Sequence, residues 1–103
     1  MTAEWHQVAT LDELDPDYPK RVMVGRAEIA LYIVEGKVYA TADLCSHAYA
    51  RLSNGHVEGF QVFCPVHQAS FDIRTGAATA EPAEDPIPTY PAELRDGAIF
   101  VQV

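Results

Sequence analysis

Two short segments, each pairing a cysteine with a histidine, place the strongest constraint on how this chain can fold. They read Cys-Ser-His from position 45 and Cys-Pro-Val-His from position 64, and sixteen residues separate them. The chain has two cysteines in all, and both stand in these pairs. Thiolate and imidazole are ligands that transition-metal centres use. A fold that uses both pairs at one centre must bring the segments together, and the candidate ligands are Cys45, His47, Cys64 and His67.

The sequence around these pairs resembles the Rieske family. The chain reads Thr-Ala-Asp-Leu-Cys-Ser-His from Thr41, then Leu-Ser-Asn-Gly from Leu52, then Cys-Pro-Val-His-Gln-Ala-Ser-Phe-Asp-Ile-Arg-Thr-Gly from Cys64. It is similar over its whole length to the soluble Rieske ferredoxins of bacterial ring-hydroxylating dioxygenase systems, such as those for naphthalene and biphenyl. It departs from the family pattern at Ala48 and Gln68-Ala69, where glycines are usual.

The resemblance implies one [2Fe–2S] cluster per chain, with Cys45 and Cys64 on the inner iron and His47 and His67 on the outer iron. It also implies a carrier of one electron in aromatic-compound catabolism, without enzymatic activity of its own. The donor would be a flavin- and NAD(P)H-dependent ferredoxin reductase. The acceptor would be a terminal Rieske non-haem iron oxygenase.

The second ligand segment also predicts a low reduction potential. High-potential Rieske proteins typically carry a Ser and a Tyr where this chain has Ala69 and Phe71, and they join the two loops by a disulfide where it has Ala50 and Val66. Hydrogen bonds to the cluster sulfurs help to set the potential within the range of about −150 to +300 mV. We therefore expect a value near about −150 mV.

Three other interpretations of the paired residues stay open. One is a zinc-stabilised interaction module, because structural zinc also accepts two Cys and two His, although zinc fingers usually pair Cys with Cys and His with His. The chain could instead be the Rieske-like small subunit of an assimilatory nitrite reductase. A catalytic Cys with a His base is a poorer fit, because the sequence offers no evident third orienting group. His6 and His56 lack ligand-like neighbours and are interpreted as surface residues.

Composition narrows the possible partners and location. Fifteen acidic residues against seven basic ones give a net charge of −8, which argues against a nucleic-acid partner. The longest apolar run, from Ile29 to Val34, is far shorter than the ~20 residues of a membrane helix. The N-terminus has no signal-peptide pattern, and both cysteines are expected to be ligands. We therefore expect a cytoplasmic protein without a membrane partner, and a monomer is expected as well.

Strand patterns and turn residues predict an all-β fold. Strands are expected at 5–9, 21–25, 28–34, 37–40, 90–95 and 98–103, with tight turns at Glu35-Gly36 and Asp96-Gly97. Residues 11–14 could form one helical turn, and the proline-rich segment 82–91 is expected to be irregular. Trp5, Tyr32 and Tyr39 are interpreted as packing aromatics, and Asp43 and Asp72 as capping or turn residues.

These elements predict one Rieske domain over residues 1–103. It would be an antiparallel β-sandwich or barrel, with an inserted cluster-binding subdomain at about 43–76. In the resembled family a third loop, which contains proline, covers the cluster. Glu81-Pro82-Ala83 stands where that loop is expected.

Overall fold

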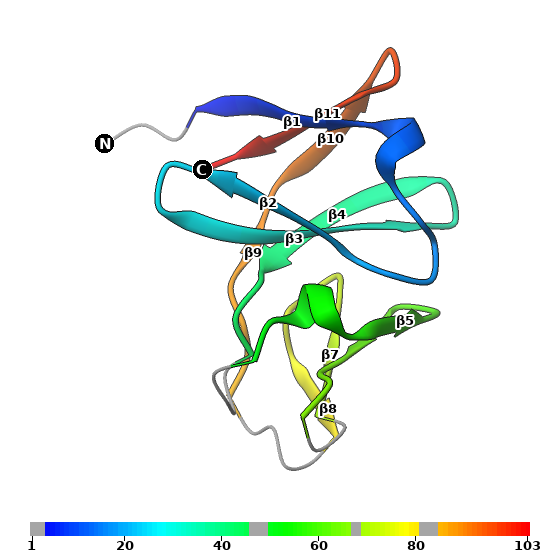
Figure 1. Ribbon diagram of the computed structural model, residues 1–103, viewed down its shortest axis with the longest axis vertical. Helices are drawn as coiled ribbons and strands as arrows, with labels where there is room; N and C mark the ends of the chain where they lie inside the picture. The colour runs from blue at the N-terminus through cyan, green and yellow to red at the C-terminus, as the bar shows by residue number, and fades with distance from the viewer. Residues whose placement is uncertain (1–3, 46–49, 67–68, 81–84) are drawn as a thin grey trace.

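The computed structural model describes residues 4–45, 50–66, 69–80 and 85–103, and these form three antiparallel sheets (Figure 1). One sheet has the order β1-β11-β10, and a second has the order β2-β3-β4-β9. The small sheet has the order β5-β6-β7-β8 and lies at one end of the molecule, beyond the other two (Figure 1). The strands are β1 (Trp5–Thr10), β2 (Lys20–Val24), β3 (Ala27–Val34), β4 (Lys37–Ala42), β5 (His56–Glu58), β6 (Gln61–Phe63), β7 (Ser70–Asp72), β8 (Ala78–Ala80), β9 (Thr89–Tyr90), β10 (Ala92–Arg95) and β11 (Ala98–Gln102).

The described ranges contain no α-helix; their two helical segments are single 3-10 turns, η1 (Leu11–Glu13) and η2 (Leu52–Asn54). The first confirms the helical turn expected after Thr10, whose side chain and Glu13 form a capping box. Within these ranges, no helical segment has the length and apolar character that a bilayer-spanning helix needs. The predicted all-β, antiparallel architecture is therefore confirmed.

Strand β3 is buried on both faces, which explains its unbroken run of apolar residues. Ile29 and Leu31 pack with Ile99 and Val101 in the core between the first two sheets, which we call the sandwich core. The alternate residues of β3 point to a second core under the small sheet, which we call the site core. The site core comprises Ala30, Tyr32, Val34, Cys45, Leu52, Val57, Val62, Cys64, Ala69, Phe71, Ile73 and Ile87. One strand therefore connects the sandwich directly to the region that contains both cysteines.

Two predicted hairpin turns have the backbone that their sequences require. Glu35 and Gly36 have φ of 52° and 77°, and Asp96 and Gly97 have φ of 48° and 79°. Positive φ at both central positions defines the type I′ turn, whose twist suits antiparallel hairpins. These turns set the registers Val34↔Lys37 and Arg95↔Ala98.

The predicted strand from Tyr90 to Arg95 is confirmed for Ala92–Arg95 but wrong at its start, because Pro91 separates Tyr90 from it. Thr89 and Tyr90 pair with Thr41 and Ala40 in the second sheet, whereas Ala92–Arg95 pair with β11 in the first. Proline has no N–H to donate to a ladder, so the chain changes sheets at this residue. The expectation of an irregular segment at 82–91 therefore holds for residues 85–88 but fails at β9, and residues 81–84 lie outside the described ranges.

Candidate metal centre

The first cysteine begins a short loop that leaves the second sheet. After β4 ends at Ala42, the Cys45 amide donates a hydrogen bond of 2.9 Å to the Ala50 carbonyl oxygen. Leu44 and Arg51 form an isolated antiparallel bridge next to this bond. The Cys45 side chain turns inward, and the residue is 4% exposed.

The second cysteine begins a loop that is closed by a backbone hydrogen bond in the same way as the first. The Cys64 amide donates a hydrogen bond of 2.7 Å to the Ala69 carbonyl oxygen, the same five-residue spacing as in the first loop. Strands β6 and β7 continue from this bond as a ladder, in which Phe63 pairs with Ser70 and Val62 with Phe71. Cys64 is 1% exposed. The structure thus places both cysteines at the bases of two similarly closed loops.

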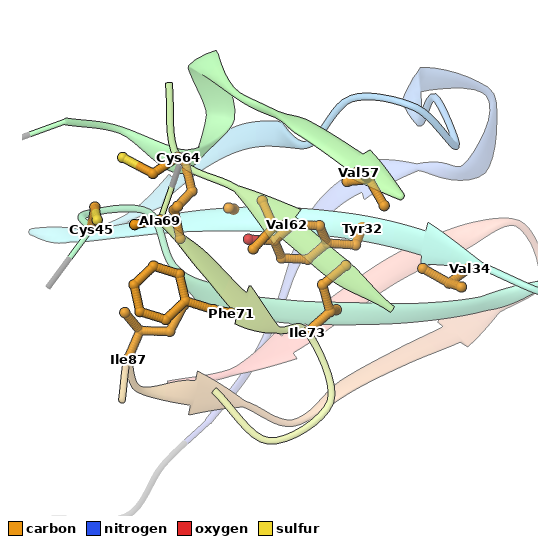
Figure 2. Packing of buried hydrophobic residues seen from close by; sticks show 12 residues of the cluster. Tyr32, Val34, Cys45, Val57, Val62, Cys64, Ala69, Phe71, Ile73 and Ile87 are labelled. Atoms are coloured by element: carbon orange, nitrogen blue, oxygen red, sulfur yellow. The ribbon is translucent and has the colours of Figure 1, made fainter. Parts of the chain in front are cut away.

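The two thiols lie together at one end of the site core, with Val34 at the opposite end (Figure 2). Burial raises the pKa of the Cys64 thiol to about 11. The nearby Cys45 thiol also raises it, whereas the Val66 backbone amide lowers it. Two buried thiols in contact fit a metal centre, because a bound cation compensates the negative charge that each thiol acquires when it loses its proton. The described geometry therefore suits the thiolate half of a [2Fe–2S] site.

Apolar groups line the core behind the cysteines. Ala69 and Phe71 are fully buried and pack in the site core, where Figure 2 shows Phe71 against Ile87 near the cysteine end. The nearest hydroxyl along β7, on Ser70, is hydrogen-bonded to Thr79 Oγ1 at 2.7 Å. Ala50 and Val66 are half-buried and pack against the same core. These residues exclude water from the inner side of the site without adding a free hydroxyl donor.

A buried carboxylate anchors the first loop. Asp43 is 0% exposed, and its two oxygens accept hydrogen bonds from the Ser53 amide at 2.8 Å and the Ser53 hydroxyl at 2.9 Å. The Asp43 carbonyl oxygen also accepts a bond of 2.6 Å from the Leu52 amide. The interpretation of Asp43 as a capping residue is confirmed, since its carboxylate accepts the Ser53 amide of η2, but this bond spans ten residues and is not a local turn. Residue type alone does not show that an acidic residue is buried. The sequence therefore gave no reason to expect a bond between Asp43 and Ser53.

Two guanidinium groups extend this anchor to the sandwich. Arg21 Nε and Arg51 Nε lie 3.5 Å and 3.9 Å from Asp43 Oδ2. Both arginines also bond Glu28 Oε1 on β3, at 2.9 Å from Arg21 Nη2 and 2.7 Å from Arg51 Nη2. Side-chain hydrogen bonds from Arg21 and then Arg51 lower the pKa of Glu28 below its ordinary value. The first loop is therefore joined to β2 and β3 through charged groups.

The structure describes some of the remaining predicted site residues but not all of them. His47, His67, Ala48, Gln68 and Glu81-Pro82-Ala83 lie outside the described residues. His56 is a surface residue as predicted: its ring stacks on Phe63 at 4.9 Å, and its Nε2 lies 2.9 Å from Glu58 Oε2. His6 lies half-buried on β1, opposite Val101. Within the described ranges, no three Cys, His, Asp or Glu side chains gather as a metal site.

The predicted packing and turn residues occupy the expected environments. Tyr32 is 1% exposed and its hydroxyl lies 2.8 Å from Thr41 Oγ1, while Tyr39 packs edge-on against Phe60 at 6.0 Å. Trp5 lies beside the Arg95 guanidinium. Asp72 Oδ1 accepts the Arg74 amide at 2.8 Å, which confirms a turn role.

Comparisons with known proteins agree with this arrangement. The model of the Rieske [2Fe-2S] domain family matches residues 4–91. The anthranilate 1,2-dioxygenase ferredoxin subunit of Burkholderia cepacia is 43% identical over 98% of this chain and 94% of its own length. The ferredoxin component of the naphthalene 1,2-dioxygenase system of Pseudomonas putida is 38% identical over 100% of this chain and 99% of its own.

Solved structures show the same likeness. A ferredoxin from Sphingomonas yanoikuyae B1 superposes with a TM-score of 0.91 at 35% identity, covering 97% of this chain and 99% of the other. A complex of reduced oxygenase and oxidised ferredoxin from carbazole 1,9a-dioxygenase contains a chain with a TM-score of 0.87 at 34% identity, covering 94% and 91%. A Mycobacterium tuberculosis protein assigned as a nitrite reductase small subunit, covering 100% and 97%, has a TM-score of 0.87 but 22% identity, which shows a shared fold alone. The chain belongs to the Rieske [2Fe–2S] domain family, and its full-length relatives include ferredoxin components of dioxygenase systems.

Proposed function

We propose that this protein is an electron-transfer ferredoxin whose [2Fe–2S] cluster is held by Cys45, His47, Cys64 and His67. The observation that carries the proposal is the contact between two buried thiols at the bases of two matched loops. Each loop continues into a histidine, two residues after Cys45 and three after Cys64. This order suits a centre in which two thiolates hold one iron and two imidazoles hold the other.

The chain's own residues would determine how the site works. When bound, the cluster takes up and releases one electron. The two thiolates offset the core's formal charge of +2, while neutral imidazoles add none, so an added electron meets less repulsion than at a four-thiolate site. The site core keeps water from the buried side, and the two closed loops limit movement of the ligands.

We propose that the donor is a flavin-containing, NAD(P)H-dependent reductase and the acceptor a terminal oxygenase that acts on aromatic compounds. The names of the relatives support a role as a dioxygenase component, and the carbazole dioxygenase complex supports direct contact with an oxygenase. In this scheme the protein is a cytoplasmic monomer that itself neither binds the aromatic substrate nor catalyses its oxidation. Residues 1–103 form one domain, in which about 43–76 make the cluster-binding subdomain.

The test is to purify the protein without oxygen and measure iron, acid-labile sulfide and zinc. We expect two irons and two sulfides per chain, together with the electron paramagnetic resonance signal of a reduced Rieske centre. Stoichiometric zinc without iron would show the zinc-stabilised module instead. In a reconstituted dioxygenase reaction, substrate oxidation should depend on adding this protein. Stable copurification with a large sirohaem subunit would identify a nitrite reductase component.

A further inference from the structure

The two ligand loops are closed by different means. At the second loop, the Cys64–Ala69 hydrogen bond continues into a ladder of three residue pairs between β6 and β7. At the first loop, the Cys45–Ala50 and Leu52–Asp43 backbone hydrogen bonds flank one isolated bridge, Leu44–Arg51, and no strand ladder continues from it among the described residues. A ladder holds the second loop from behind, so the first loop needs another support if both cysteines are to stay in place.

Asp43 and Ser53 supply that support. They stand on either side of the first loop, ten residues apart, and both carboxylate oxygens of Asp43 bond to Ser53. Because neighbouring residues of an extended chain point to opposite sides, Asp43 and Cys45 turn inward whereas Leu44 is 43% exposed. Any movement of the Asp43 carboxylate therefore shifts the segment from which the Cys45 thiol projects.

The carboxylate is also joined to the rest of the fold. Its charge is balanced by Arg21 from β2 and by Arg51 from the far side of the loop. Glu28 holds both guanidinium groups in place, and its carbonyl oxygen accepts the Asp43 amide at 3.0 Å. Hydrogen bonds to a charged group are shorter and stronger than neutral ones, so this network can fix a loop that lacks a ladder.

We infer that Asp43 is a positioning residue for the metal centre: it closes the first ligand loop through Ser53 and holds Cys45 against Cys64. The inference rests on the proposed function, because it concerns the same [2Fe–2S] site. Asp43 acts through Cys45 and is not itself a ligand. Removal of its carboxylate should speed the loss of the cluster more than it lowers the stability of the fold.

The test compares cluster retention with fold stability in the holoprotein. Ser53→Ala removes the hydroxyl bond to Asp43, and Asp43→Asn replaces the charged acceptor. The comparison variant is Thr41→Val, which removes another buried hydroxyl bond, that to Tyr32, and leaves the bonding groups of Asp43 and Ser53 unchanged. For each protein we would measure the rate at which visible absorbance is lost to an iron chelator, the resonance line width of the reduced form, and the midpoint of urea unfolding.

Ser53→Ala should lose its cluster about fivefold faster than the unaltered protein, the effect of about one hydrogen bond, and Asp43→Asn at least about tenfold faster. Both should broaden the resonance lines, and Ser53→Thr should restore the original rate. Thr41→Val should lower the unfolding midpoint without faster cluster loss.

If Asp43→Asn does not fold, the comparison of Ser53→Ala with Thr41→Val tests the inference. Cluster loss in Ser53→Ala no faster than in Thr41→Val would overturn the inference. An unaltered protein that binds no cluster would instead overturn the proposed function.

Discussion

Gly55 lies directly against the backbone of Phe63, so close that a Cβ atom on Gly55 would come within 1.8 Å of the Phe63 carbonyl oxygen. Gly55 follows η2, which ends the first ligand loop, and Phe63 immediately precedes Cys64. This contact is therefore a direct backbone connection between the two ligand segments, and it is possible because glycine has no side chain.

Gly55→Ala should destabilise the fold by about 3 kcal/mol, because the added methyl group must displace the backbone before Cys64. The matched control is Gly59→Ala, at a position with φ of 60° where a Cβ atom would meet nothing within 4 Å. The control carries the left-handed backbone cost alone, about 1–2 kcal/mol. Urea unfolding followed by the fluorescence of Trp5, the single tryptophan, measures both. Because Gly55 has φ of −94°, its substitution carries no left-handed backbone cost, so a loss in Gly55→Ala smaller than that in Gly59→Ala would show that the Phe63 contact is unimportant.

Replacing either cysteine with serine should abolish the visible absorption or leave a labile remnant, because the inner iron loses a thiolate ligand. The controls are His6→Ala and His56→Ala, whose side chains lie on β1 and β5. Iron content and absorption spectra should be unchanged in both controls. Retention of the cluster in His47→Ala together with its loss in His56→Ala would contradict the ligand assignment.

The unaltered protein should have a low reduction potential, near about −150 mV, because Ala69 and Phe71 offer no hydroxyl to the cluster sulfurs. Phe71→Tyr and Ala69→Ser should each raise the potential if the new hydroxyl reaches a sulfur. A bond strengthened on reduction by roughly 1 kcal/mol gives a shift of several tens of millivolts. Phe100→Tyr, on β11 in the first sheet, is the control and should leave the potential unchanged. A value above about +100 mV for the unaltered protein, by voltammetry, would contradict the low-potential assignment.

Acid should weaken the fold through Glu28. Hydrogen bonds from Arg21 and Arg51 hold the pKa of Glu28 below its ordinary value of 4.5. A lowered pKa in the folded state means that the carboxylate stabilises the fold above the unfolded value, and that this contribution is lost as pH falls through the folded pKa. Asp72, bonded chiefly by Arg74, should lose its contribution in the same direction below its ordinary value of 3.8.

The measurement is the free energy of urea unfolding at a series of pH values from about 7 down to about 3. The difference between the unaltered protein and Glu28→Gln should be largest at neutral pH. It should shrink at pH values below about 4.5, where protonation of Glu28 makes the two side chains alike. A difference that stays constant across this range would show that Glu28 contributes through packing alone.

Features that depend on neighbouring residues, such as turns and short motifs, could be predicted from the sequence. The Glu35-Gly36 and Asp96-Gly97 turns were identified because positive φ is a property of a few residue types, and the structure confirms both. The Cys/His pairs and the residues around them resemble the motifs of the Rieske family, and the match to the family model confirms that assignment. Assignment of His47 and His67 as ligands stays a prediction.

Contacts between distant residues decided the rest. The sequence did not predict the three-residue strands β5 to β8, whose pairing depends on neighbours and not on a long alternating pattern. Ile29 and Ala30 are adjacent and both apolar, yet they face different cores, and the arrangement of the sheets assigns them. Asp43 became an anchor because folding brings Ser53, Arg21 and Arg51 to it. Burial and charge compensation arise only when the chain closes on itself, so they belong to the tertiary structure.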